Sequence, residues 1–489
     1  MTEEQIKRFL DDREAQLHQI RVAHGKLQFA QYESKRPQPG MAELESKQAA
    51  LQRDPALAAA CVQWQGRAAD PLLARRVELW SQSIRRAQVD GDADILRLRR
   101  ELANDLVAAR YDIGGREVEL GIVRDTLRKE PDAARRRLTW LSYGRLSRAL
   151  DGRLRELIRL RNARAREAGF DGYLGLALGH AGLSRPQVES ILQRLCEATD
   201  ARFMDLLGGR PVAAWDVGYL LEGQAAPPAD RFPRAQMLQR LEDWSTRHGL
   251  DLRSSGISLH FIDIPYNGLS MPIDPPHDVR MLLNPGDGHL YYKLLWHEYG
   301  HALHAAGNQQ PGVVLRQEPP IFNESMAESL AFFTLDPEWV RSYGADPAAT
   351  LRAGLGAWLV WLRTRSAHAL FEYRAYDNPD GDLDQLYAEV EARFLGCAED
   401  AAPRWAANGW FTSYPVYWQN YVLADVVAAQ IHASMRAQLG RVEGNPEAIA
   451  FLRERFWAPG ASVDWQEKLK RATGRPMGPE DLISRLQAG

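Results

Sequence analysis

The sequence predicts a large, mainly helical protein that contains one small sheet. Apolar residues recur at helical spacing from residue 3 to about 205, and the same periodicity returns from residue 287 to the C-terminus. Between these regions, residues 257–262 alternate between apolar and polar side chains, and residues 279–283 form a short apolar run. Both patterns are typical of strands. We therefore expect a helical architecture with a small antiparallel sheet.

The length and charge of the chain limit the class of protein. With 489 residues, the chain is long enough for several packed subdomains around a cleft. The formal net charge is −3, so no basic excess is available to neutralise phosphates, and nucleic acid is not expected as a partner. The sequence also lacks the roughly 18 consecutive apolar residues of a membrane-spanning helix. We therefore expect no membrane partner.

The cysteines and the N-terminus predict where the protein resides. The chain has three cysteines, Cys61, Cys196 and Cys397, and they form no Cys-x-x-Cys pair. A sparse, odd count argues against a disulfide framework and fits a reducing compartment. The first seven residues include three charged side chains, Glu3, Glu4 and Lys7, and lack the apolar segment of a signal peptide. The predicted location is the cytoplasm.

The residues that carry chemistry lie in the segment 289–306, which reads HLYYKLLWHEYGHALHAA. It contains the pattern H-E-x-x-H as His297, Glu298 and His301. Residues four apart on a helix share a face, so both imidazoles can reach one metal ion. Zinc accepts imidazole nitrogen as a ligand, and a glutamate beside the pair can take a proton from metal-activated water. The segment therefore predicts a zinc site on a helix.

A catalytic zinc site needs a third protein ligand and one open position. Glu324 and Glu328 lie one helical turn apart in an apolar segment that contains Phe322, Met326 and Leu330. Acidic residues in such surroundings need a partner. Metal ligation by Glu324, and a hydrogen bond from a ligand histidine to Glu328, would supply one. The alternative is that both carboxylates are exposed on the helix surface.

These motifs resemble the gluzincin metallopeptidases, and most closely the thimet oligopeptidase and oligoendopeptidase F family. The phrase HEYGHALH matches the family pattern H-E-x-G-H-x-x-H at every fixed position. The spacing from His297 to Glu324, with another acid four residues later, is also similar. Residues 159–173 and 215–219 give looser matches, so the resemblance covers about residues 140–430. Angiotensin-converting enzyme and the thermostable carboxypeptidases are more distantly similar.

The resemblance implies a fold, a cofactor and an activity. The implied fold is a zincin-type peptidase with a deep substrate channel and with the sheet beside the active-site helix. A helical lid would span residues 1–135 and a catalytic region residues 136–489, with the zinc-site core at about 255–430. One Zn²⁺ per chain would support hydrolysis of peptide bonds in short peptides, with Glu298 as the general base.

The resemblance also assigns roles to a tyrosine-rich segment, residues 413–421. Tyr417 is similar to the residue that stabilises the oxyanion in the family, and Tyr414 is similar to a substrate-binding residue. Tyr421 lies one helical turn further and is a third candidate for the same cleft. The alternative interpretation of this segment is an aromatic stripe in the core.

Three further residues are candidates around the site. The family usually has a histidine shortly before the catalytic tyrosine, but no histidine occurs between residues 369 and 431, and Asn408 is the candidate donor in its place. Gly268 precedes the last strand, where a small residue lets a substrate backbone pair with the sheet edge. His304 lies almost one turn beyond His301, and we expect it to support a ligand or to pack in the core rather than to bind the metal.

Two other functions stay open, and the missing histidine supports the first of them. One is a metal-dependent amidase or deacylase that acts on a specialised, non-oligopeptide substrate. The other is a pseudopeptidase that captures peptides without cleaving them. The second alternative is less favoured, because a decayed site usually loses one of its residues, whereas this chain has all of His297, Glu298, His301, Glu324 and Tyr417.

Overall fold

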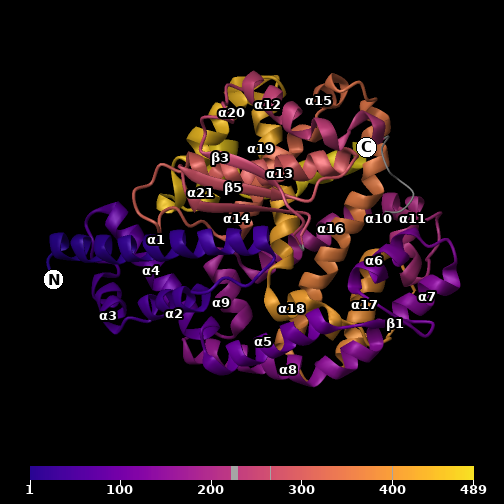
Figure 1. The fold of residues 1–489 in the computed structure, drawn as a ribbon, viewed down its shortest axis with the longest axis horizontal. Coiled ribbons are helices and arrows are strands. Elements are labelled where there is room, and N and C mark those ends of the chain that lie inside the picture. The colour runs from indigo at the N-terminus through magenta and orange to yellow at the C-terminus, as the bar shows by residue number, and fades with distance from the viewer. Residues whose placement is uncertain (222–228, 265, 399, 489) are drawn as a thin grey trace. The chain divides into compact units, whose positions relative to one another are not determined.

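The chain folds into two compact units in a computed structural model that describes all residues except 222–228, 265, 399 and 489 (Figure 1). Unit 1 is assembled from three segments of the chain, Met1–Gln88, Pro228–Thr350 and Ala424–Asp481. Unit 2 is assembled from the segments Val89–Pro227, Leu351–Leu423 and Leu482–Gly489. Both units are mostly helical, which confirms the predicted fold class.

Unit 1 contains the sheet and the helices around it. Its strands are β3 (Ile257–Phe261), β4 (Gly268–Asp274) and β5 (Asp278–Leu283). Its helices are α1 (Glu3–Ser34), α2 (Met41–Gln52), α3 (Pro55–Trp64), α4 (Pro71–Asp90), α12 (Met237–Arg247), α13 (His289–Gly307), α14 (Pro320–Ala331), α15 (Pro337–Ser342), most of α19 (Trp418–Leu439), α20 (Pro446–Leu452) and α21 (Trp465–Thr473).

Unit 2 is built from helices and one short hairpin. The hairpin pairs β1 (Tyr111–Ile113) with β2 (Arg116–Val118). The helices are α5 (Ala93–Ala108), α6 (Leu120–Lys129), α7 (Ala133–Leu141), α8 (Tyr143–Glu167), α9 (Tyr173–His180), α10 (Arg185–Leu206), α11 (Val217–Leu221), most of α16 (Pro347–Asp377), α17 (Leu383–Leu395), α18 (Gly409–Ser413) and most of α22 (Glu480–Ala488).

The sheet of unit 1 has the order β3-β5-β4 and lies against α13 (Figure 1). The pair β4–β5 is antiparallel, as predicted, but the pair β3–β5 is parallel. Strand β5 lies between β3 and β4 although it follows both in the sequence. Because β5 turns back from β4, it runs in the same direction as β3.

Strand β4 was not predicted from the sequence. Gly268 and Pro272 interrupt its pattern, and both residue types are depleted in strands. Pro272 is tolerated here because β4 is an edge strand, where one row of backbone donors needs no partner in the sheet. The pairing register with β5 shifts between Pro272 and Asp274, as in a bulge.

The N-terminal helices pack within unit 1. Thr2 and Gln5 form a reciprocal capping box at the start of α1, with hydrogen bonds of 3.3 and 2.8 Å. The apolar face of α1 packs in one core cluster with residues of α3 and α4. Further along α1, Phe29 packs against Met271 and Ile273 of β4. Whether residues 1–135 act as a lid stays a prediction.

Within the described part of the chain, no helix is both long and apolar enough to cross a bilayer.

Candidate metal centre

Helix α13 presents two histidines to the same region of unit 1. Leu295, Trp296 and Tyr299 of this helix are fully buried and fix which face points inward. His297 and His301 lie one turn apart, their ring centroids are 4.9 Å from each other, and their ring planes are nearly perpendicular. Both imidazoles therefore point into one small volume, as the H-E-x-x-H spacing predicts.

Helix α14 approaches α13 closely at Gly300. A Cβ atom at this position would lie 2.7 Å from the Cα of Ala327 and 2.8 Å from the carbonyl oxygen of Met326. Only glycine allows this approach, because a methyl group would collide with the backbone of α14. The contact brings the side chain of Glu324 to the two histidines, with Oε2 3.5 Å from His297 Nε2 and 3.8 Å from His301 Nε2.

The three side chains form a cluster that fits a metal ion. One ligand atom from each of His297, His301 and Glu324 lies within 4.8 Å of the others. Donors at 2.0–2.1 Å from a tetrahedral zinc ion are about 3.4 Å apart, close to the observed separations between the carboxylate and the imidazoles. Two imidazoles and one carboxylate are also a donor set of catalytic zinc sites, which keep a fourth position open.

Glu328 contacts the Nδ1 atom of His297, and Lys293 contacts Glu328. Glu328 Oε1 is 2.9 Å from His297 Nδ1, and Lys293 Nζ is 3.1 Å from the other oxygen of Glu328. Burial alone would raise the pKa of Glu328, but Lys293 and His297 outweigh it and hold that pKa far below its usual range. A carboxylate at Nδ1 fixes the ring so that Nε2 faces Glu324 and is available to a metal ion.

The proton affinities of the two histidines differ. Burial alone would lower the pKa of His297, but its contacts with Glu324 and Glu328 outweigh burial and raise that pKa well above the usual value. Burial lowers the pKa of His301 to about 4. A metal ion binds neutral imidazole, so it would displace a proton from His297 and find His301 already neutral.

Glu298 lies between α13 and the edge strand β4. Its side chain is only 6 % exposed, and burial raises its pKa to about 7, while a backbone hydrogen bond from Ser270 acts in the opposite direction. A Cβ atom at Gly268 would lie 2.6 Å from Glu298 Oε1. The absence of a side chain at Gly268 therefore makes room for the carboxylate of Glu298, and its predicted role in admitting a substrate backbone stays a prediction.

A buried network supports α13 on the side of α12. Trp244 packs edge-on against Trp296, with ring centroids 5.7 Å apart, and its indole N–H donates to Glu443 at 3.0 Å. The neighbouring hydroxyl of Ser245 donates to Tyr299 at 3.1 Å. These contacts tie the two residues that flank the H-E pair to a second helix.

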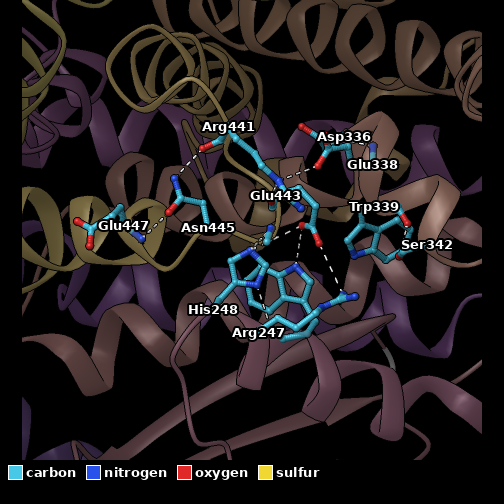
Figure 2. Close-up of polar contacts among 12 residues, drawn as sticks. Arg247, His248, Asp336, Glu338, Trp339, Ser342, Arg441, Glu443, Asn445 and Glu447 are labelled. Atoms are coloured by element: carbon cyan, nitrogen blue, oxygen red, sulfur yellow. Dashed lines mark hydrogen bonds and ion pairs between the residues drawn. The ribbon is translucent and has the colours of Figure 1, made fainter.

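Glu443 is the centre of this network (Figure 2). Arg247 lies 3.6 Å from its carboxylate, and His248 lies 3.8 Å from it. Burial raises the pKa of Glu443 to about 7 and lowers the pKa of His248 to about 4. His248 Nδ1 is 2.9 Å from the carbonyl of Trp244, and Nε2 is 2.9 Å from the amide of Gly444, an arrangement that suits a neutral ring.

His304 is not one of the three side chains of the metal cluster. It is buried, its ring packs edge-on against Phe322, and its Nε2 lies 4.0 Å from Glu318 Oε1. Glu318 in turn contacts Lys468. Burial and the nearby lysine lower the pKa of His304 well below its usual value, so the ring packs as a neutral side chain.

The tyrosine-rich segment belongs to unit 2. Tyr414, Tyr417 and Tyr421 form a chain of ring contacts with Trp410, with centroid separations of 4.8 to 6.1 Å. Tyr414 is 43 % exposed. Asn408 caps α18, because its side-chain oxygen accepts the amide of Trp410 at 3.2 Å. The roles of these four predicted residues toward a substrate stay predictions.

Sequence reasoning missed three residues around the cluster. Lys293 has a signal, because it lies four residues before His297 on the same helix face. The backbone of Ser270 and the support from Glu443 have no comparable signal, since both depend on long-range packing against α13.

Comparisons with known proteins define the class of fold. No protein-family model matches the chain, and no curated protein matches its sequence. The chain shares its overall fold with a solved carboxypeptidase structure. The solved structure that carries this conclusion is the crystal structure of the M32 carboxypeptidase from Deinococcus radiodurans R1, with a TM-score of 0.72 and 15 % identity over 98 % of this chain and 98 % of that chain.

Proposed function

We propose that the protein is a zinc-dependent peptidase that hydrolyses short peptides. The observation that carries the proposal is the cluster of His297, His301 and Glu324, with the buried carboxylate of Glu298 on the same helix. We propose one Zn²⁺ per chain, held by the three clustered side chains, with Glu328 orienting His297.

The chemistry follows from the environment of each residue. Zinc bound at this cluster would polarise the scissile carbonyl and acidify water. Glu298 would take the proton from the attacking water and deliver it to the leaving amine. The burial of Glu298 favours this role because it raises the pKa of the carboxylate to about 7. A group with a pKa near the working pH can both accept a proton from water and donate it to the leaving amine. Tyr417 would donate to the oxygen on which negative charge develops.

The substrate class and the cleavage position are finer parts of the proposal. The resemblance of the metal motifs favours an oligopeptidase that excludes folded proteins through a helical lid and a deep channel. The fold comparison is with a carboxypeptidase, which favours removal of C-terminal residues. Both subtypes hydrolyse peptide bonds, so the shared proposal is a zinc-dependent peptidase, and the resemblance of the metal motifs adds the preference for short peptides.

The test is zinc content measured alongside hydrolysis of quenched fluorescent peptides of graded length, with and without a chelator. We expect chelator-sensitive cleavage that declines as the peptides lengthen, and the product masses distinguish internal cuts from C-terminal trimming. Glu298→Gln is the matched control, because it should keep zinc and lose at least about 100-fold in kcat.

Two outcomes would overturn the proposal. Zinc-loaded protein that cleaves no peptide but hydrolyses acylated small molecules would identify an amidase or deacylase. Zinc-loaded protein that binds peptides and hydrolyses nothing would identify a pseudopeptidase. Wild-type rates in Glu298→Gln would refute the assignment of the general base.

A further inference from the structure

The backbone directly before Tyr417 has an unusual conformation. Val416 has φ of 53°, in the left-handed region that β-branched residues rarely adopt. Its side chain is buried, so the segment from Ser413 to Tyr417 is not a loose surface turn. A strained conformation persists only where surrounding contacts impose it. The contacts that hold Val416 therefore identify what fixes the tyrosines on either side of it.

Two buried side chains hold the peptide groups of Val416. Glu372 from α16 is 2 % exposed, and its Oε1 accepts the amide of Val416 at 2.9 Å. Gln419, also buried, donates its side-chain amide to the carbonyl of Val416 at 2.6 Å. Both the donor and the acceptor of this residue are thus bound by side chains rather than by a helix or a sheet.

A third buried side chain holds the chain just before the tyrosines. Arg161 from α8 is 2 % exposed, and it donates to the carbonyls of Phe411 and Thr412 at 3.0 and 2.7 Å. It also donates to the hydroxyl of Tyr376 at 3.2 Å, one turn beyond Glu372 on α16. All of these residues belong to unit 2, and together they fix both ends of the segment.

We propose that Arg161, Glu372 and Gln419 form a buried clamp that positions Tyr417, and with it Tyr414, for the reaction. The clamp residues are positioning residues, because they act through the backbone of the tyrosine segment. This proposal rests on the proposed function, because the clamp matters for catalysis only if Tyr417 stabilises the oxyanion.

The energetics favour a positioning role over ordinary packing. A buried carboxyl group costs free energy unless it is well bonded, and an apolar residue would usually stabilise a core more. Glu372 makes one hydrogen bond to the segment, and its other oxygen is buried without a hydrogen-bond partner among the described residues. Burial raises its pKa to about 8, so it acts mainly as a neutral acid that accepts one amide. We therefore attribute the buried carboxyl group of Glu372 to its role in holding the strained Val416 beside Tyr417.

The test is a double-mutant cycle between Glu372→Leu and Tyr417→Phe, measured as kcat and KM on a cleaved peptide. We expect Glu372→Leu to lower kcat on the order of 10- to 100-fold with little change in KM or zinc content, because misplacing a catalytic group costs about this much. The double variant should be no slower than Tyr417→Phe alone, since the clamp acts through that hydroxyl.

Two variants separate positioning from general stability. Glu372→Gln keeps an acceptor for the Val416 amide and should recover most of kcat. Leu192→Ala creates a cavity in α10 of the same unit, where the side chain is fully buried, and should lower the melting temperature without changing kcat. Additive losses in the double variant, or equal losses in Glu372→Gln and Glu372→Leu, would overturn the proposal.

A second readout does not depend on peptidase activity. Hydrogen exchange of residues 411–421 should be at least about 10-fold faster in Glu372→Leu than in the wild type, because the Val416 amide loses its acceptor. If the wild type cleaves no peptide, the proposed function fails, and the exchange rates still test the clamp. Unchanged exchange in Glu372→Leu would refute it.

Discussion

Glu324 and Glu328 lie one helical turn apart on α14, but their carboxylates face different atoms of the cluster. Glu324 approaches both Nε2 atoms, whereas Glu328 binds Nδ1 of His297 and Lys293. We therefore propose that the first carboxylate binds the metal ion directly and that the second orients His297. This difference gives a graded prediction for zinc affinity.

We predict that Glu328→Gln weakens zinc affinity by about 10- to 100-fold, the usual cost of losing a carboxylate that supports a ligand histidine. Glu324→Ala should weaken it further, because a ligand itself is lost. Chelator competition titrations measure both affinities. Glu338→Ala, which removes an exposed carboxylate from α15 of the same unit, is the control and should bind zinc as the wild type does. Stoichiometric, tightly held zinc in Glu324→Ala would contradict the ligand assignment.

The pairing of α13 with α14 depends on one glycine. Because Gly300 has no side chain, the backbone of α14 can approach α13 closely and bring Glu324 to the histidines. The helix pair, rather than the H-E-x-x-H segment alone, therefore sets the geometry of the cluster.

We predict that Gly300→Ala destabilises the fold by about 1–3 kcal/mol, because the added methyl group overpacks against the backbone of α14. It should also weaken zinc binding, because Glu324 moves away with its helix. Gly152→Ala is the matched control: this exposed position in α8 has open space for a Cβ, and the change should stabilise the helix by up to about 1 kcal/mol. Thermal unfolding and chelator titration measure the two effects. Wild-type zinc affinity in Gly300→Ala would show that the close approach is not required.

The helices and strands that could be predicted from the sequence are those with a clear local spacing of side chains. The periodicity of α13 and α14 placed His297 with His301, and Glu324 with Glu328, on shared helix faces. The alternation of apolar and polar residues located β3 and a short apolar run located β5, but neither pattern located β4. Gly268 and Pro272 interrupt such a pattern in β4, and Pro272 is tolerated there because one row of backbone N–H donors in an edge strand needs no partner in the sheet.

Long-range packing accounts for what the sequence could not predict. No local pattern shows that β5 lies between β3 and β4, which makes one strand pair parallel. Likewise, Gly268 shows its contact with Glu298 only once β4 is laid against α13. In the sequence, Glu372 and Arg161 are an acid and a base on two helices with no pattern that sets them apart. Their hydrogen bonds to the tyrosine segment are visible only in the folded protein.

The whole fold is shared with a carboxypeptidase over nearly the full length of both chains at 15 % identity. At this identity, the arrangement of helices is kept while most side chains differ. Specificity depends on side chains, so the cleavage position cannot be transferred with the fold. It has to be measured from products.

Buried carboxyl groups outside the metal cluster give the protein a pH-dependent stability. Burial raises the folded-state pKa of Glu443 to about 7, whereas an unfolded glutamate titrates near 4.5. Between these two values the folded protein holds a proton that the unfolded chain has lost. The unfolding free energy therefore falls as the pH rises through this window, by at most about 1.4 kcal/mol per pH unit for one group.

We predict that Glu443→Gln removes this contribution, so the melting temperature of the wild type should fall relative to the variant as the pH rises from 4.5 to 7. Histidines with lowered pKa values that do not contact Glu443, such as His289, act in the opposite direction below their ordinary pKa, but their effect is common to both proteins and cancels in the difference. His248 lies 3.8 Å from Glu443, so its titration changes with the substitution and the difference reports the pair. Glu447→Gln, an exposed acid four residues away in Figure 2, is the control and should leave the difference flat. A constant difference between the wild type and Glu443→Gln across this range would mean that Glu443 is ionised in the folded protein, with Arg247 as its effective counter-charge at 3.6 Å.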